Sequence, residues 1–339
     1  MLRQEKLTGM IQEFLPEQLV FKTSGILPAR SVVGETATWD IETTPRGKLG
    51  FQGNGSPAKP LSLNGIKQKT ARLGRIFVSK NLQAAMWQNI RQPGSEAEQM
   101  AAQQQIAREE REFASAFDRT EEFLISSAIQ GKIEGVKVDD LEIDDIDYGM
   151  PAGNIFAHNE ANPDLNCGDW LDESTNIPDA VRKIKLAVRR ATGYALKRAY
   201  ISDEIQVGLL QNDTFKTYMA QTAAGQRAME EGSLGRFMGL DWFPVDHVFI
   251  DDDGSTEVPY IPANLAVFTP APSEDWGYLQ YGSELIPNDA RTGFKQVLGR
   301  YSFATMQDNP PGLTLFAGYR LLPIIRKPGA LAKATVTAA

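Results

Sequence analysis

The chain has 339 residues with a formal net charge of −8, and 42% of its residues are hydrophobic and 23% charged, as in ordinary globular proteins. No run of 18 apolar residues is present, which excludes a membrane-spanning helix, and the charged N-terminus lacks the apolar core of a secretion signal. The single cysteine, Cys167, excludes a disulfide within the chain and suits a reducing cytoplasm, and no Cys/His cluster offers a zinc site.

The N-terminal third predicts an arm followed by a long hairpin. Residues 1–33 are expected to be an N-terminal arm, because proline and glycine break their short apolar stretches. Residues 32–41 predict a strand, and residues 61–77 are expected to return beside it after a tip rich in Gly, Pro and Lys. A phosphate-binding P-loop is disfavoured, because GNGSPAK lacks the Gly-Lys-Ser/Thr ending that precedes a helix.

Residues 95–130 predict one unusually long helix, because they contain neither Gly nor Pro. Ser95 and Glu98 match a capping box, and Gly131 supplies the stop. One apolar stripe follows helical spacing: Ile106, Phe113, Phe117, Leu124, Ile125, Ala128 and Ile129. Charged residues fill much of the remaining surface: Glu109, Glu110, Arg111, Asp118, Arg119, Glu121 and Glu122.

Three structures are compatible with such a helix. A coiled coil is disfavoured, because heptads are not sustained, and a bundle would need other helices of matching length, which the sequence does not predict. A single long helix lying along a sheet or an elongated body remains the simplest reading of the pattern.

The stretch GVKVDDLEIDDIDYG alternates apolar and polar residues, which predicts strands with an acidic solvent face. A calcium loop is the alternative, but the EF-hand spacing with its glycine and final glutamate is absent. Further along, DDDGSTE predicts a turn between strands rather than a metal site at Asp251, Asp252 and Asp253.

Residues 178 to 320 predict an α/β region. A helix is expected from Pro178 to Gly193, with Val181, Ile184 and Val188 as its apolar stripe and basic residues on a solvated face. A second helix is expected from about 214 to 230. The basic face of the first helix is not expected to read DNA, because no second helix follows at helix-turn-helix spacing.

The sequence contains no local motif that indicates catalysis. The sequence lacks GxSxG, HExxH and GxGxxG, and Cys167 has only His158 and His247 as possible activating partners, neither of them in a recognisable context. We therefore expect neither enzymatic activity nor a cofactor, with an α/β enzyme whose site is assembled from distant residues as the rival class.

Charge is unevenly distributed along the chain. Residues 43–95 carry nine basic residues and no acidic one, whereas residues 134–147 carry seven acidic residues and only Lys137. The basic segment could contact nucleic acid, or one copy's basic segment could dock on another copy's acidic segment. Two unrelated solvated surfaces are the third possibility.

Several stretches, in chain order, resemble the lambda-type (family E) major capsid protein of tailed bacteriophages. They include the basic hairpin, the stretch from LQAAMWQNIRQPGSEAEQ to FLISSAIQGKI, and YIPANLAVFTPAPSEDWGYLQYG. The closing GRYSFATMQDNPPGLTLFAGYRLLPIIRKPGAL is the most specific, with a strand, an aspartate-containing turn, a second strand and a Pro-containing apolar run. The resemblance covers most of residues 20 to 330 and is weakest at 150–175 and 210–235.

The resemblance implies an α+β chain with the Hong Kong 97-type capsid fold. Its expected parts are an N-terminal arm (1–33), an extended loop (34–77), a peripheral domain (78–175) with a spine helix at 95–130, an axial domain (176–295), and a return to the peripheral domain with a C-terminal tail (296–339). The long helix would then stiffen a thin subunit, with its apolar face on the peripheral sheet.

The implied function is that of a major capsid protein that self-assembles, as hexamers and pentamers, into an icosahedral shell around double-stranded DNA. Implied partners are other copies, a separate scaffolding protein, a portal and a decoration protein, with only weak, non-specific contact to packaged DNA and none to a membrane. A separate scaffold is expected because the family-like part begins by about residue 20. The protein would be assembled in the bacterial cytoplasm and reside in the virion. A tail or portal-associated phage protein is the alternative.

Contacts between subunits are expected where the basic segment of one copy meets the acidic segment of its neighbour. The residues assigned to this contact are Arg46, Lys48, Lys59, Lys67, Lys69, Asp139, Asp140, Asp144 and Asp145. The Lys and Asn residues that crosslink subunits in some relatives have no recognisable match here, so no crosslink is assigned.

Overall fold

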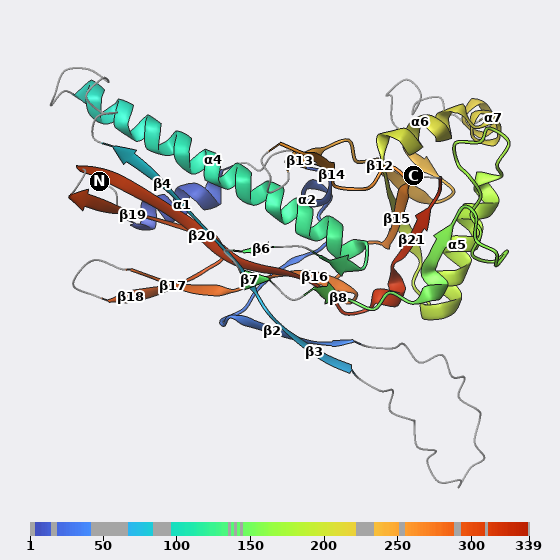
Figure 1. Ribbon diagram of the computed structural model, residues 1–339, viewed down its shortest axis with the longest axis horizontal. Coiled ribbons are helices and arrows are strands. Elements are labelled where there is room, and N and C mark those ends of the chain that lie inside the picture. Colours follow the sequence, from blue (N-terminus) through green and yellow to red (C-terminus); the bar gives the residue numbers. More distant parts are fainter. Residues whose placement is uncertain are drawn as a thin grey trace, which may run out of the picture.

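A computed structural model describes residues 4–14, 19–41, 67–83, 96–134, 137–138, 141–142, 145–221, 234–250, 255–287, 293–308 and 311–337. They form the mixed α+β chain expected from the sequence, with one hydrophobic core beneath a long helix and a second in an α/β region. The long helix and long strands extend away from the α/β region, which gives an elongated subunit (Figure 1).

The long helix α4 (Glu96–Ile129) confirms the predicted spine helix. Its end is also as expected, because Gly131 adopts a φ of 100° and its N–H donates to the carbonyl of Ala128. All seven residues of the predicted apolar stripe are buried. The periodicity of the sequence therefore identified both the helix and the side that packs.

A five-stranded sheet lies against α4, and its central strand is β20 (Pro311–Ile325). One edge of β20 pairs with β4 (Gly74–Gln83), and further partners are β19 (Tyr301–Asp308) and β16 (Gly277–Tyr281), to which β1 (Ala29–Ser31) adds in parallel. At about 3.3 Å per residue, the fifteen residues of β20 span roughly 50 Å, which matches the long axis of α4.

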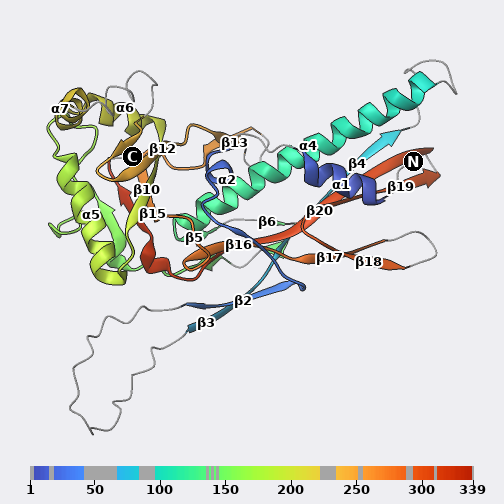
Figure 2. The ribbon, with the colours of Figure 1, turned by 180° about the vertical axis from the view of Figure 1, so that it is seen from behind.

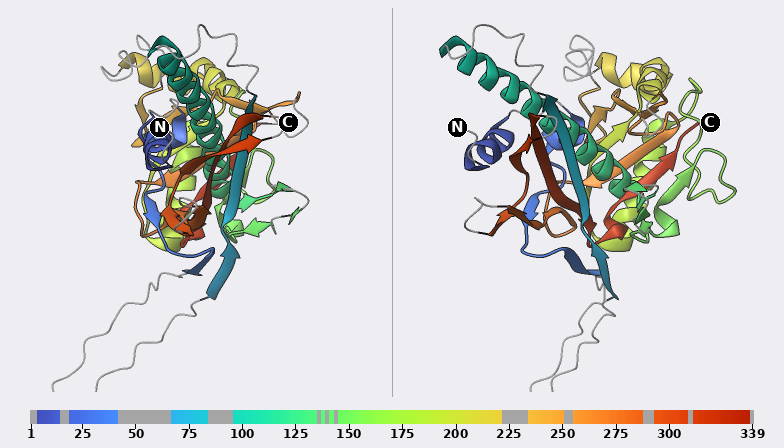
Figure 3. Two further views of the ribbon diagram at one scale, coloured as in Figure 1. Left: turned by 90° about the vertical axis from the view of Figure 1, so that its left-hand side faces the viewer. Right: turned by 60° about the vertical axis from the view of Figure 1, so that its left-hand side comes forward.

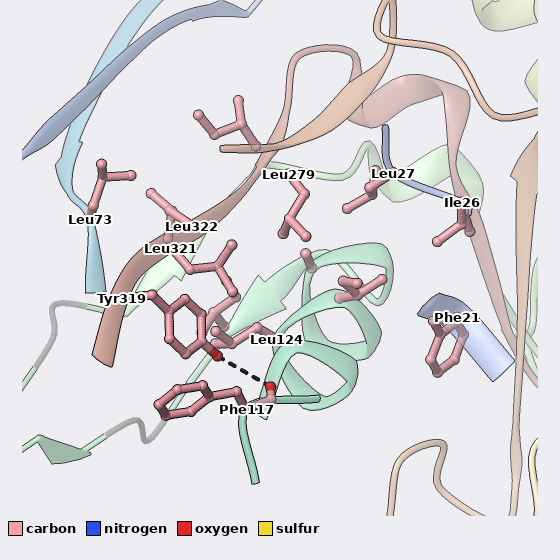
Figure 4. Close-up of a cluster of buried hydrophobic side chains, with 14 of the residues drawn as sticks. Phe21, Ile26, Leu27, Leu73, Phe117, Leu124, Leu279, Tyr319, Leu321 and Leu322 are labelled. Carbon is pink, nitrogen blue, oxygen red and sulfur yellow. Dashed lines mark hydrogen bonds between the residues drawn. The ribbon is translucent and has the colours of Figure 1, made fainter. Parts of the chain in front are cut away.

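Helix α4 packs on one face of this sheet through aromatic and aliphatic side chains. Phe117 meets Tyr319 edge to face with ring centroids 4.7 Å apart, and the Tyr319 hydroxyl donates to the Phe117 carbonyl at 3.2 Å (Figure 4). Leu124 lies in the same cluster, and Leu279, Leu321 and Leu322 extend it along the sheet. This core needs no coiled-coil partner, since the sheet itself covers the apolar stripe.

The N-terminal segment also packs on this layer. Helix α1 (Gln4–Glu13) buries Leu7 and Ile11 against α4 and β19, and the short helix α2 (Val20–Ser24) buries Phe21. The predicted arm is thus ordered over its described residues and belongs to the main core (Figure 2).

The α/β region is a six-stranded sheet in the order β11-β12-β10-β15-β21-β9. Its strands are β11 (Arg236–Phe237), β12 (Leu240–Pro244), β10 (Leu196–Ile201), β15 (Leu265–Pro270), β21 (Ala332–Thr335) and β9 (Ile155–Ala157). The helices beside it are α5 (Ile177–Thr192), α6 (Asp203–Gln211) and α7 (Asp213–Gln221). Two short 3-10 helices, η1 (Ala152–Asn154) and η2 (Pro328–Ala330), join the regions.

Helix α5 confirms the predicted helix, with Val181, Ile184 and Val188 fully buried. Its start differs slightly, because Asn176 is the cap and accepts a hydrogen bond from the N–H of Asp179. Helix α7 covers the beginning of the predicted 214–230 helix, and residues 222–233 lie outside the described residues.

Two segments join a sheet other than the one their position suggested. Residues 155–157 were expected in the peripheral domain and residues 332–335 in the C-terminal tail, yet β9 and β21 are neighbours in the six-stranded sheet. Their backbone groups pair in register from Lys333↔Ile155 to Thr335↔Ala157, a long-range pairing that local pattern does not encode. The domain boundaries themselves remain a prediction.

Five two-stranded units complete the described elements. They are β2 (Thr36–Ile41) with β3 (Lys67–Arg72), β5 (Lys132–Ile133) with β8 (Ile146–Asp147), β6 (Lys137–Val138) with β7 (Leu141–Glu142), β13 (Val248–Ile250) with β14 (Glu257–Pro259), and β17 (Ser283–Pro287) with β18 (Phe294–Leu298). The β13–β14 pair flanks the predicted DDDGSTE turn, whose Asp251–Asp253 lie outside the described residues. Figure 3 shows β2–β3 projecting away from the α4 layer.

A substitution at Gly282 tests how tightly the chain is packed where β16, the segment before β2 and the base of β17 meet. A Cβ at this position would lie 2.6 Å from Leu73 Cδ1 and 2.9 Å from the carbonyl oxygen of Gly34, which belongs to the backbone and cannot turn away. Gly282→Ala should therefore lower the free energy of unfolding by about 1–3 kcal/mol in urea titrations of unassembled subunits. The matched control is Gly9→Ala in α1, where no atom lies within 4 Å and where alanine should stabilise by about 0.5–1 kcal/mol. Equal effects of the two variants would contradict this packing.

Candidate assembly site

The root of the extended loop is the β2–β3 hairpin. Its strands pair antiparallel from Thr36↔Arg72 to Ile41↔Lys67, so the predicted hairpin exists, but its return strand ends at Arg72 instead of Phe77. After Leu73 the chain enters β4, which pairs with β20, and the apolar side chains Leu73 and Leu82 are buried in the main core. Residues 42–66, the loop itself, lie outside the described residues.

One face of the hairpin root is anchored and the other is exposed. Ala37 and Trp39 are buried, and the Trp39 ring lies 6.4 Å from the ring of Tyr148, which follows β8. On the opposite face, the hydroxyls of Thr38 and Thr70 lie 3.2 Å apart at the surface. The body of the subunit therefore holds the base of the loop in a fixed direction.

The sequence-predicted contact residues are only partly described. Lys69 donates its ammonium N–H to the backbone carbonyl of Asp147 in the same chain, which brings the basic segment to the border of the chain's own acidic segment. Lys67 and Asp145 are exposed. The others lie outside the residues whose side chains the structure describes: Arg46, Lys48, Lys59, Asp139, Asp140 and Asp144. Their contact with a neighbour stays a prediction.

The charged face of α4 is where the structure departs most from the sequence prediction. We expected its acidic residues on the free surface of the helix, yet five of them are buried: Glu109, Glu110, Asp118, Glu121 and Glu122. Buried carboxylates are costly unless they are paired, so each one needs a partner from another element.

Asp118 and Glu121 form a buried ionic cluster with Lys22 of α2 and Arg300, which precedes β19. The Arg300 guanidinium lies 2.5 Å from Asp118 and 2.8 Å from Glu121, and Lys22 pairs with Asp118 and lies 2.9 Å from Glu121. Burial opposes the charge on Arg300, but Glu121 and Asp118 outweigh it and raise the pKa of Arg300 above its usual value. This ionic cluster joins the N-terminal arm, the long helix and the sheet.

Glu122 caps the first turn of α2. Its carboxylate accepts hydrogen bonds from the backbone N–H groups of Phe21 at 2.6 Å and Lys22 at 2.9 Å. These are donors that a helix start leaves unsatisfied, and the negative charge suits the positive end of the helix. Burial raises the pKa of Glu122 although both hydrogen bonds and Lys22 act in the opposite direction.

Hydrogen bonds through Ser302 connect Glu110 of α4 to β19 and to α1. The Ser302 hydroxyl donates to Glu110 at 2.5 Å, while the Thr8 hydroxyl of α1 donates to the Ser302 carbonyl at 3.0 Å and accepts from its N–H at 3.3 Å. Within the described part of the chain, the second carboxyl oxygen of Glu110 has no hydrogen-bond partner. Burial raises the pKa of Glu110 to about 7, so its neutral form persists far above the usual carboxyl range.

The described residues also include the buried Cys167, whose thiol forms no disulfide. Burial raises the pKa of the Cys167 thiol to about 12, which leaves it a poor nucleophile at neutral pH. It borders an open polar depression of about 360 Å³ with Asn166, Asp179 and Lys183. In the described ranges no three His, Cys, Asp or Glu side chains are grouped as metal ligands, and no helix there has the length and apolar character to cross a bilayer.

Comparison with known proteins decides the family. The family model described as phage major capsid protein E matches residues 4–336. The chain belongs to this family. No curated protein sequence gave a match.

Solved structures agree on the fold. A structure assigned to a capsid protein of an Escherichia coli CFT073 prophage has a TM-score of 0.59 at 18% identity and covers 80% of both chains. The capsid of cyanophage P-SCSP1u gives 0.51 at 12% identity over 96% of this chain and 90% of that one. The mature capsid of bacteriophage PhiM1 gives 0.50 at 15% identity over 96% and 89%. The expected Hong Kong 97-type fold is confirmed, and the capsid protein is a structural component of the virion.

Because of the ionic cluster, we expect substitution of Arg300 to lower the stability of the subunit strongly. Arg300→Met removes the guanidinium that pairs with both Asp118 and Glu121, and removal of one member of a buried ion pair typically costs about 3–5 kcal/mol. Urea unfolding of unassembled subunits should show a loss of this order. Arg182→Met is the matched control, since Arg182 is 61% exposed and pairs with Asp179 on the surface of α5, where the cost should stay below about 1 kcal/mol. Similar losses in both variants would refute the buried cluster.

We expect the stability of the subunit to depend on pH through the buried carboxyl group of Glu110. Its folded pKa of about 7 lies above the unfolded value near 4.5, so its contribution is fully present below pH 4.5 and is lost as the pH rises through 7. Between pH 5 and pH 8 the wild type should lose on the order of 2–3 kcal/mol that Glu110→Gln retains. Unfolding titrations at the two pH values measure this difference.

The control for this pH dependence is Glu112→Gln on the exposed side of the same helix. Hydrogen bonding and charge from Lys80 lower the pKa of Glu112, so its contribution is lost only at more acidic pH and Glu112→Gln should keep the wild-type loss of stability between pH 5 and pH 8. If Glu110→Gln followed the wild-type pH profile, the assignment of a neutral, buried Glu110 would be wrong.

Proposed function

We propose that this capsid protein assembles with copies of itself, as hexamers and pentamers, into an icosahedral shell that encloses double-stranded DNA, and that it does so without catalysing a reaction. The observation that carries the proposal is the family match over residues 4–336, combined with the stiff, elongated body built by α4 and β20. An elongated subunit with an anchored projecting hairpin suits tiling, since each copy can reach its neighbours.

The proposed partners are those that a shell needs in order to assemble, to admit DNA and to withstand its contents. A separate scaffolding protein would guide the curvature of the shell, a portal would occupy one vertex, and a decoration protein or non-covalent clamping would reinforce the surface. DNA would be contacted weakly and non-specifically, because a net charge of −8 repels phosphates and packaged DNA must later be released.

Assembly is tested by expressing the protein together with its neighbouring reading frames and fractionating the lysate on a sucrose gradient. Round, uniform particles tens of nanometres wide in negative-stain electron microscopy would support the proposal. Small rings or tubes would instead indicate a tail or portal-associated component, and a discrete small oligomer would favour the enzyme class.

The extended loop is proposed to clamp a neighbour by charge. Reversing Lys59, Lys67 and Lys69 to glutamate should prevent particle formation while leaving the subunit folded, because the three new carboxylates then repel the acidic 134–147 segment of the next copy. Reversal of Arg182, Arg190 and Lys216, exposed on α5 and α7, makes the same charge change away from the loop and should leave assembly intact. Gradient profiles and thermal unfolding of both variants provide the measurement, and normal shells from the loop variant would disprove the clamp.

A further inference from the structure

The β17–β18 hairpin presents an apolar face to solvent. Its strands pair antiparallel with Ser283↔Leu298, Leu285↔Gln296 and Pro287↔Phe294, so these residues share one face. On this face Phe294 is 73% exposed, Leu285 64% and Leu298 44%, and Pro287 is exposed too. Scattered exposed apolar residues are common, but a two-stranded unit with its apolar side outward is not a stable arrangement in water by itself.

The opposite face and the base hold the hairpin rigidly. Ile286 is 1% exposed, and the Glu284 carboxylate binds Arg75 at 3.3 Å and also pairs with Arg320 on the five-stranded sheet. At the base, the Ser283 hydroxyl accepts from the N–H of Gly34 at 3.0 Å and from the Gln296 amide at 2.8 Å. The apolar face is therefore fixed in direction and is not turned inward by a flexible stem.

The hairpin lies on the side of the sheet away from α4. Arg75 and Arg320 are opposite one another in the β4–β20 register, two residues along their strands from Phe77 and Gly318, which face away from the helix. Tyr319, on the other face, contacts Phe117 of α4. In Figure 1 the hairpin runs beside β19 and β20 toward the end of the subunit that is farthest from the α/β region. Nothing else in the described part of the chain covers its outer face.

The size of the exposed face favours a repeated contact over a stable pair. One phenylalanine and two leucine side chains exposed to this degree present on the order of 300 Å² of apolar surface. A stable two-protein interface buries about 800 Å² on each partner. A contact of this size is weak alone and becomes effective when each subunit makes several at once, as in a shell.

The face is also continuous with the extended loop. Gly34, whose N–H binds Ser283, is the second residue before β2, where the extended loop begins, and the neighbouring Val33 is 67% exposed. We infer that the outer face of the β17–β18 hairpin, with Val33 at its foot, is a docking surface for a second copy of this chain. The inference rests on the proposed self-assembly and adds to it a surface that joins subunits by apolar contact beside the charged loop.

The test combines a disruptive variant with a chemical probe of the same face. Leu285→Ser with Phe294→Ser should lower the yield of particles by about tenfold or more on the gradient. Phe294→Leu, which keeps the apolar character, should retain assembly. In Phe294→Cys subunits the new thiol should react with a maleimide when unassembled and be protected in purified particles. The wild type gives the background, since its only cysteine, Cys167, is buried.

The outcomes separate this inference from the proposed function. Wild-type particles with loss of assembly in the double variant and protection of residue 294 would support it. Normal particles from the double variant, or a thiol that remains reactive inside particles, would overturn it while leaving the capsid function intact. Protection found only in particles that contain another virion protein would replace the second copy with that protein. Failure of the wild type to form any particle would overturn the proposed assembly itself. If the double variant does not fold, the labelling of Phe294→Cys decides.

Discussion

The structure depends on how the carboxylates of α4 are paired beneath its surface. Asp118 and Glu121 lie between Arg300 and Lys22, so one cluster fixes the helix to the sheet and the arm to the helix. Apolar side chains alone pack without strong directional preference, and a helix on a sheet could shift by one turn, about 5.4 Å, at modest cost. Ion pairs that are buried do not tolerate such a shift, because each carboxylate would lose its partner in a medium that solvates it poorly.

This fixed register explains why a thin body can be stiff. The helix packs against β20, and the pairing of Phe117 with Tyr319 places an apolar contact next to the ionic cluster. Glu110 and Glu122 extend the same principle to α1 and α2, whose few buried residues would otherwise hold them weakly. The arm therefore gains much of its order from α4 instead of from its own sequence.

The sequence predicted what depends on local periodicity and failed on what depends on distant partners. The bounds of α4, its stop at Gly131 and its apolar stripe follow from residue spacing, and so does the buried stripe of α5. The acidic residues of α4 looked solvent-exposed, since Lys22 and Arg300 lie 96 and 182 positions from Asp118. The pairing of β9 with β21 is equally non-local. The sequence did contain an indication of this arrangement. Acidic residues that recur beside the apolar stripe of one helix are costly to bury unless cations from other elements pair with them.

A subunit made for a shell differs from an ordinary monomer in the surfaces that it leaves uncovered. The main core is closed by aromatic and ionic contacts, whereas the anchored hairpins β2–β3 and β17–β18 project from it without a covering layer in the described chain. Strong contacts within the subunit and weak ones at its edges are what assembly requires, because weak contacts can break and reform until each copy sits correctly. Many such contacts act together in a closed shell, so stability of the whole does not need any single interface to be strong.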